Sequence, residues 1–299
     1  MQGSLAGRCP TRTHAQRRGF TIVELIGVLL AIGMIVFMFL VLTPSRHRHQ
    51  PQLKCSTHVR NVVQAMQIWA QSNRDQYPLP STLDVNNATT IEPGRQKDHL
   101  ANVLSILIFN ALITPEVCIS PSEVSTNMTY KTNYEPSNPS AAADPANALW
   151  DPSFKADFTG AAPANNSYAA LQLSNSRLAM WSNAFNATEA VFGNRGPRIN
   201  SIKRSAKGRA SVDADPASLT YQIHGHRTTW EGNIGYNDGH VKLESTYDPA
   251  EVLLPGTGKP RLTDVLHADD PEDPEHVNTF LGIFTTGGEL HTGGMPIWD

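Results

Sequence analysis

The chain has 299 residues, of which 40 % are hydrophobic and 17 % are charged, and its formal net charge at pH 7 is −3. This length suits one or two domains, and the composition is that of an ordinary globular protein. A slightly acidic chain lacks the basic surface that binding to nucleic acids normally requires, so no nucleic-acid partner is expected.

A long apolar run near the N-terminus organises the rest of the sequence. From Phe20 to Leu42, the only strongly polar residue is Glu24. A helix over these residues would rise roughly 34 Å, enough to cross a bilayer core of about 30 Å. The run therefore predicts a transmembrane helix over residues 20–42. A carboxylate inside such a helix is costly, so Glu24 predicts a positively charged partner.

The residues at the start of this run, RRGFTIVEL at positions 17–25, resemble the processing signal of type IV prepilins. In that family a membrane aspartyl peptidase cuts after the glycine and methylates the new N-terminus. The resemblance implies that residues 1–19 are a basic leader, that Gly19 is the cleavage residue and that Phe20 is the mature N-terminus. It also implies that Glu24 is the assembly carboxylate, which pairs with the N-terminus of a neighbouring subunit in a helical filament. The other interpretation is an ordinary signal anchor with an incidental glutamate.

The same resemblance implies partners and a location. The partners would be the prepilin peptidase, other pilin or pseudopilin subunits and the inner membrane. The protein would cross the inner membrane once, with its N-terminus cytoplasmic before processing and its globular domain periplasmic or extracellular. Basic residues flank both ends of the apolar run, so this orientation rests on the resemblance.

Helical periodicity returns after a polar segment that contains Pro44 and Pro51. Its apolar positions form one stripe, made by Val59, Val62, Val63, Met66, Trp69 and Ala70. Because proline kinks a helix, we expect residues 20–73 to form one long, kinked helix. Residues 43–73 would be its amphipathic continuation, which packs on the globular domain.

The stretch from Cys55 to Pro78 resembles a segment of large bacterial prepilin-like proteins, which are often labelled type II secretion pseudopilins. A disulfide persists in the oxidising compartment that such a domain would face. Cys55 and Cys118 would remain after the leader is removed. The sequence leaves two alternatives open for them, a disulfide or two buried free thiols.

The remaining residues, 74–299, predict an α+β globular domain with an antiparallel sheet packed on the long membrane-spanning helix, as in pilins. A second helix is expected at His99–Ile113, and an irregular insertion at about 131–167. The expected strands are Tyr168–Leu173, Leu178–Trp181, Leu219–Ile223 and a hairpin over Asn233–Leu243. Asn237-Asp238-Gly239 forms the turn of that hairpin, because these residues tolerate positive φ.

One constellation of residues suggests chemistry. His224 and His226 would point to the same side of a strand, and the hairpin would bring Asp238 or His240 beside them. Two or three imidazoles with a carboxylate are a possible zinc site. However, residues 232–241 also resemble the C-terminal signature of the large prepilin-like proteins, which favours a structural role and no cofactor.

Two functions follow from these patterns. The chain contains no Gly-x-Ser-x-Gly elbow, Walker-type phosphate loop or dinucleotide fingerprint, so no catalytic residue and no enzymatic activity are expected. The first hypothesis is a structural subunit, cleaved after Gly19 and assembled through its N-terminal helix into a type II secretion pseudopilus or type IV pilus-like filament. The alternative is a membrane-anchored extracytoplasmic domain that binds metal or catalyses a reaction through His224, His226, Asp238 and His240.

Overall fold

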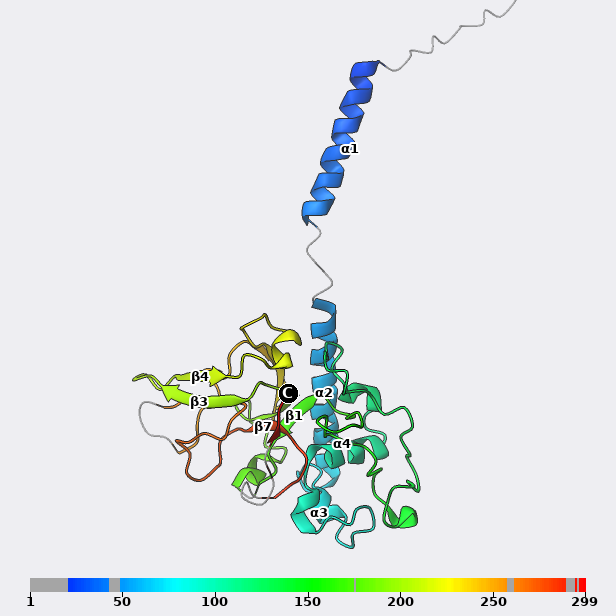
Figure 1. The fold of residues 1–299 in the computed structure, drawn as a ribbon, viewed down its shortest axis with the longest axis vertical. Coiled ribbons are helices and arrows are strands. Elements are labelled where there is room, and N and C mark those ends of the chain that lie inside the picture. Colours follow the sequence, from blue (N-terminus) through cyan, green and yellow to red (C-terminus); the bar gives the residue numbers. More distant parts are fainter. Residues whose placement is uncertain (1–20, 43–48, 175, 257–260, 289–293, 295) are drawn as a thin grey trace, which may run out of the picture. The chain divides into compact units, whose positions relative to one another are not determined.

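The structure is a computed structural model that describes residues 21–42, 49–174, 176–256, 261–288, 294 and 296–299. The chain divides into two compact units, Met1–Arg48 and His49–Asp299 (Figure 1). The first unit contains helix α1 (Ile22–Leu42), and the second contains every other helix and strand that is described.

The expected membrane-spanning helix is not supported by the structure. None of the helices in the described part of the chain has both the length and the apolar character needed to cross a membrane. The predictions of a transmembrane segment over residues 20–42, of a pilin-like fold built on it and of a single-pass inner-membrane location are therefore wrong.

The amphipathic helix that was expected to follow is α2 (His49–Ser72). The kink was predicted in the segment that contains Pro44 and Pro51. Residues 43–48 of that segment lie outside the described residues, and Pro51 lies in the first turn of α2. The apolar stripe of α2 is confirmed, because Val59, Val62, Val63, Met66 and Ala70 are buried and Trp69 is partly buried.

An antiparallel sheet forms the core of the second unit, in the strand order β6-β5-β2-β1-β7-β8. Its strands are β1 (Tyr168–Leu171), β2 (Ala190–Asn194), β5 (Gly232–Tyr236), β6 (Val241–Glu244), β7 (Leu281–Phe284) and β8 (Pro296–Ile297). A separate two-stranded sheet consists of β3 (Ile199–Arg204) and β4 (Ala210–Ala214) and stands to one side in Figure 1. The predicted α+β content with an antiparallel sheet is thus confirmed.

Helix α2 packs against β5, β2 and β6 of this sheet. The contact is close at Gly235 of β5. A Cβ atom at this position would lie 2.7 Å from Val63 Cγ2 and 3.0 Å from Val59 Cγ1. A larger residue would push the helix away from the sheet, so Gly235 permits the spacing that buries the apolar stripe of α2.

Two further α-helices are α3 (Pro80–Leu83) and α4 (Leu100–Phe109). The helix predicted at His99–Ile113 is thus present but ends earlier. Ala111 has a φ of +56°, a left-handed conformation that does not continue an α-helix.

Two of the predicted strands are wrong. The segments Ser176–Met180 and Leu219–Gln222 form 3₁₀-helices instead. Their backbone groups bond locally rather than across a sheet, as when Trp181 N–H donates to Leu178 O at 3.0 Å. Short apolar runs such as these fit either structure until their hydrogen-bond partners are known.

The region 131–167 is irregular apart from the 3₁₀-helix Pro145–Asn147. It is nevertheless packed into the domain, because Trp150 and Phe154 are buried. Trp150 Nε1 donates to Asn102 Oδ1 of α4 at 3.0 Å, which fastens the irregular segment to the helix.

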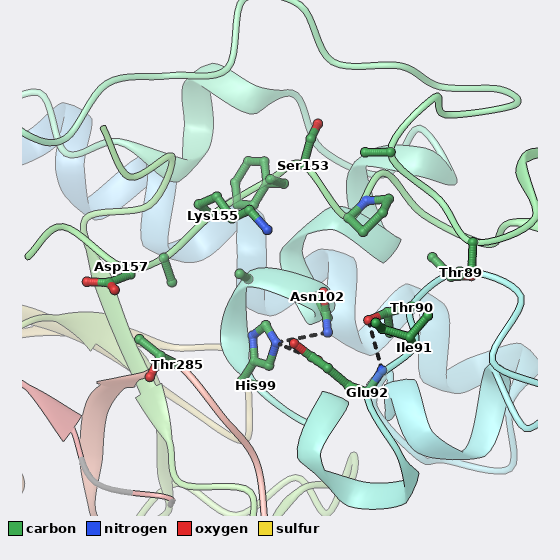
Figure 2. A pocket seen from close by; sticks show the side chains of 16 residues that line it. Thr89, Thr90, Ile91, Glu92, His99, Asn102, Ser153, Lys155, Asp157 and Thr285 are labelled. Atoms are coloured by element: carbon green, nitrogen blue, oxygen red, sulfur yellow. Dashed lines mark hydrogen bonds and ion pairs between the residues drawn. The ribbon is translucent and has the colours of Figure 1, made fainter. Parts of the chain in front are cut away.

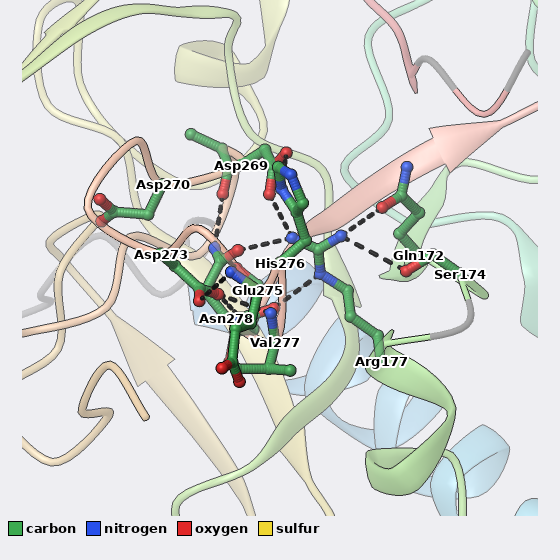
Figure 3. A network of polar contacts seen from close by, with 12 residues as sticks. Gln172, Ser174, Arg177, Asp269, Asp270, Asp273, Glu275, His276, Val277 and Asn278 are labelled. Carbon is green, nitrogen blue, oxygen red and sulfur yellow. Dashed lines mark hydrogen bonds and ion pairs between the residues drawn. The ribbon is translucent and has the colours of Figure 1, made fainter. Parts of the chain in front are cut away.

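A buried arginine joins the segment after β1 to the segment before β7 (Figure 3). Arg177 is fully buried, and its Nε donates to Asn278 O at 2.7 Å. Its other nitrogens donate to the side chains of Gln172, Asp269 and Asn278. Since a buried charge is costly without partners, these contacts fix the course of both segments.

Asp264 is a buried carboxyl group in the segment before β7. Thr279 N–H donates to its Oδ2 at 2.6 Å, and the Asn278 amide donates to its Oδ1 at 3.4 Å. Burial nevertheless raises the pKa of Asp264 to about 6, from an ordinary value of 3.8. The folded chain therefore holds a proton at this site more tightly than the unfolded chain does.

This difference predicts a pH-dependent stability. Because the folded pKa of Asp264 is the higher one, its stabilising contribution is present below about pH 4 and lost as the pH rises through about 6. Asp264→Asn removes the titration but keeps an oxygen that can accept from Thr279. Between about pH 4 and about pH 7, the original chain should lose up to about 3 kcal/mol more unfolding free energy than the variant. Urea unfolding followed by tryptophan fluorescence measures this, and a difference that does not vary with pH would contradict the raised pKa.

Candidate functional site

Helix α1 presents apolar side chains on every side. From Ile22 to Met38 each side chain is exposed, with Ile22 77 % and Phe37 67 % accessible. Since successive helical residues point about 100° apart, this run covers the whole circumference of the helix. Exposed apolar surface of this extent marks a site of interaction with another molecule.

The start of α1 is closed by a capping box between Thr21 and Glu24. The Thr21 N–H and hydroxyl both donate to Glu24 Oε2 at 2.9 Å, and Glu24 N–H donates to Thr21 Oγ1 at 3.3 Å. These bonds satisfy N–H groups that a helix end otherwise leaves unpaired. The bonds from the Thr21 backbone and hydroxyl also lower the pKa of Glu24.

This geometry revises the expectation that Glu24 needs a partner from outside. Its carboxylate already has donors within its own chain, although Thr21 brings no positive charge. The signal was present in the sequence, since Thr-x-x-Glu before an apolar run is the pattern of a capping box. Gly19 and Phe20, the predicted processing residues, lie outside the described residues.

Two segments resemble the large prepilin-like proteins, Cys55 to Pro78 and residues 232–241, and they meet inside the domain. The Tyr77 hydroxyl donates to Asn237 Oδ1, and Asn237 Nδ2 donates to Glu189 Oε2 at 2.9 Å and to Met180 O at 3.2 Å. From α2, Gln67 Nε2 donates to Asn237 O at 3.3 Å. Asn237 is fully buried. It bonds to four separate segments of the chain, and it also opens the turn of the hairpin.

The predicted hairpin itself is confirmed as β5 and β6, paired antiparallel. Gly239 has a φ of +90°, and its N–H donates to Tyr236 O at 2.9 Å across the turn. Glycine adopts this φ without steric cost. A Cβ atom at Gly239 would also lie 3.0 Å from Gln67 Oε1, so the turn packs directly against α2.

Cys55 and Cys118 are both buried and both free, which is the second of the two alternatives left open by the sequence. Ser120 Oγ donates to Cys55 Sγ at 3.5 Å, and the Asn194 side chain lies 3.4 Å from the same sulfur. Burial raises the pKa of the Cys118 thiol. A buried thiol held in its protonated form is a poor nucleophile and metal ligand.

The four candidate metal-ligating residues, His224, His226, Asp238 and His240, do not lie together in the structure. His224 lies near the start of β5, where its Nε2 is 3.3 Å from Asn233 Nδ2, and burial lowers its pKa to about 4. Asp238 and His240 lie together after the end of β5, with 2.5 Å between Asp238 Oδ1 and His240 Nδ1. The strand separates these two places by roughly 15 Å.

His226 makes a local bridge with Thr229. Across the part of the chain that the structure describes, no three His, Cys, Asp or Glu side chains are grouped so as to hold a metal ion.

A cavity that the sequence did not indicate lies between α4 and the irregular region (Figure 2). Its volume is about 430 Å³, within the usual range for small-molecule sites. It is lined by residues 89–92, the first turn of α4, residues 141, 143 and 152–157, and Thr285.

The polar side chains of the cavity belong to three segments. Glu92 and His99 form the closest charged contact, with 3.6 Å between Glu92 Oε2 and His99 Nε2. Lys155 enters from the opposite side in Figure 2. The His99 imidazole lowers the pKa of Glu92, and the Lys155 and Lys97 ammonium groups act in the same direction.

Comparisons with known proteins identify no relative. No protein-family model matches the chain, no curated protein matches it significantly, and the same holds for solved structures. The resemblance to prepilins therefore rests on the quoted residues alone.

The contact between Tyr77 and Asn237 yields a prediction. Tyr77→Phe leaves Asn237 Oδ1 without its buried donor and should lower the free energy of unfolding by about 1–2 kcal/mol, and Asn237→Ala should lower it by more. Because the two side chains bond to each other, the double variant should be less destabilised than the sum of the single effects, by about 1 kcal/mol. Urea unfolding measures all three, with the exposed Tyr130→Phe as the matched control. Strictly additive effects would show that the hydroxyl does not stabilise Asn237.

Proposed function

We propose that the protein is a prepilin-like structural subunit, cleaved after Gly19 and assembled through α1 into a type II secretion pseudopilus or type IV pilus-like filament. The observation that carries this proposal is the continuous exposed apolar surface of α1. The quoted residues at positions 17–25 supply the processing signal.

The physical case begins with the free energy of that surface. Burying one Leu, Ile, Val, Met or Phe side chain is worth about 1.5–3 kcal/mol. In α1 the exposed side chains of this kind are contiguous, and copies of α1 packed against one another would bury them together. A contact that uses different surfaces of successive copies and does not close into a ring generates a filament.

The surface of α1 also permits close approach. A Cβ atom at Gly27 or Gly33 would meet no other atom within 4 Å. A neighbouring helix can therefore come nearer to the backbone at these two positions than at the Leu and Ile positions around them. Close contact between helices increases the packing energy that each pair gains.

In the proposed assembly, the contact between Glu24 and the N-terminus of a neighbouring copy sets the register between subunits. Cleavage after Gly19 would place a positively charged α-amino group on Phe20, directly before the Thr21 cap. A carboxylate at the first turn of a neighbouring α1 is a suitable partner for such a group. The capping box with Thr21 holds Glu24 at the helix end, where the incoming amine would find it. The proposed partners are therefore the prepilin peptidase and other pilin or pseudopilin subunits.

The alternative function requires His224, His226, Asp238 and His240 to converge. The strand β5 lies between His224 and the pair formed by Asp238 and His240, and His226 bonds locally. The geometry thus supports the structural subunit rather than the metal-binding or catalytic domain, and we propose neither a catalytic residue nor a cofactor.

The capping box makes the assembly role of Glu24 testable. In cells that contain the peptidase and the other subunits, Glu24→Ala should reduce incorporation into filaments at least about tenfold, because it removes the carboxylate that pairs between subunits. Incorporation is measured by shearing the filaments from the cells and immunoblotting the chain.

Thr21→Val is the matched control. It removes the capping hydroxyl, at a cost of about 1 kcal/mol to the helix end, and keeps the Glu24 carboxylate. Incorporation of this variant should stay within about twofold of the original chain. Equal defects in the two variants would mean that Glu24 acts only as a cap, and normal incorporation of Glu24→Ala would refute the pairing.

A further inference from the structure

The cavity in Figure 2 has charged groups that the fold does not pair with each other. Lys155 is exposed, and none of the ion pairs among the described residues joins it to Glu92. Lys155 nevertheless lies near enough to lower the pKa of Glu92. A carboxylate and an ammonium group thus face the same space from opposite sides, without direct contact.

Hydrogen bonds at the floor of the cavity determine which atoms of Asn102 and His99 donate and which accept. Trp150 Nε1 can only donate, so the oxygen of Asn102 faces it and the Asn102 amino group faces His99. Asn102 Nδ2 lies 3.0 Å from His99 Nε2 and 2.8 Å from Lys97 O. In a neutral His99, Nε2 therefore accepts this bond and the proton is on Nδ1.

This arrangement leaves two polar atoms unsatisfied. Glu92 Oε2 lies 3.6 Å from His99 Nε2, just beyond hydrogen-bond distance, and has no hydrogen-bond partner among the described residues. His99 Nδ1 also lacks a partner, although His99 is only 9 % exposed. Unsatisfied buried polar atoms are uncommon in folded proteins, and each one needs a reason. An ammonium group bound in the cavity could donate to Glu92 Oε2.

The rest of the lining is mixed. Its apolar residues are Ile91, Ala101, Ala141, Ala143, Pro152, Phe154 and Ala156, and its polar residues are Thr89, Thr90, Ser153, Asp157 and Thr285. Ile91 is 84 % exposed and places an aliphatic side chain in the lining of the cavity. An occupant should therefore carry one positive group, one negative group and an apolar part.

We propose that this cavity binds a free α-amino acid with an apolar side chain, whose ammonium group contacts Glu92 and whose carboxylate contacts Lys155. His99 and Asn102 act as positioning residues that hold the Glu92 side of the site. The apolar side chain of the ligand lies against Ile91 and the alanines of the wall. The site belongs to the second unit and is independent of the proposed assembly through α1.

The test is isothermal titration calorimetry on the full chain in a non-ionic detergent, with L-leucine, L-methionine and L-phenylalanine as probes. At least one should bind with a Kd of about 1 mM or lower. For leucine, two analogues separate the charges: 4-methylpentanoate lacks the ammonium group and isoamylamine lacks the carboxylate. Each should bind at least about tenfold more weakly, because each leaves one charged group of the site without its partner.

Variants locate the binding. Glu92→Gln and Lys155→Met should each raise the Kd at least about tenfold. Glu116→Gln and Lys203→Met change the same residue types at exposed positions outside the cavity, and they should leave the Kd within about twofold. Circular dichroism confirms that all four variants are folded. Absence of saturable binding up to about 10 mM, equal binding of either analogue, or unchanged binding by Glu92→Gln would overturn the proposal.

Discussion

The close packing of α2 on the sheet is the contact on which the second unit depends. It requires glycine where the helix meets β5, because a Cβ at Gly235 would overlap Val63 and Val59. A similar restriction applies between strands, where a Cβ at Gly193 of β2 would lie 2.6 Å from Asn233 O. These two glycines let one apolar stripe, two strands and the buried polar groups beside them share a single core.

Buried polar contacts then fix the two ends of α2. Near its start, the Cys55 thiol is held by Ser120 and Asn194. Beyond its end, the Tyr77 hydroxyl bonds to Asn237. Both sites lie in segments that resemble the large prepilin-like proteins, so the resemblance coincides with residues that hold the helix to the sheet. A structural role accounts for the burial and the hydrogen bonds of these residues.

The sequence indicated the parts of the fold that are periodic or local. The stripe of α2 repeats at helical spacing, and Asn237-Asp238-Gly239 has the chemistry of a tight turn, so both were predictable. Strands β2 and β7 are buried along their whole length and show no alternation, which leaves no periodic signal. The run at Leu178–Trp181 has the composition of a strand, but the N–H groups of Leu178 and Trp181 donate to Ser174 O and Leu178 O, four and three residues earlier.

The capping box and the cavity also differ in how far the sequence could predict them. The capping box of Thr21 and Glu24 is a four-residue pattern that can be recognised in the sequence. The cavity around Glu92 and His99 is built from segments up to almost 200 residues apart, from Thr89 to Thr285. Neither periodicity nor a motif brings such segments together, because their meeting depends on how the irregular region packs against α4.

The central claim is that a processed α1 is the assembly element of a filament subunit. Mass spectrometry of the chain, expressed with and without a prepilin peptidase, tests this most directly. The account predicts an N-terminus at Phe20, methylated, when the peptidase is present, and an intact leader with Gly19 when it is absent. An N-terminus that is the same in both cases would contradict it.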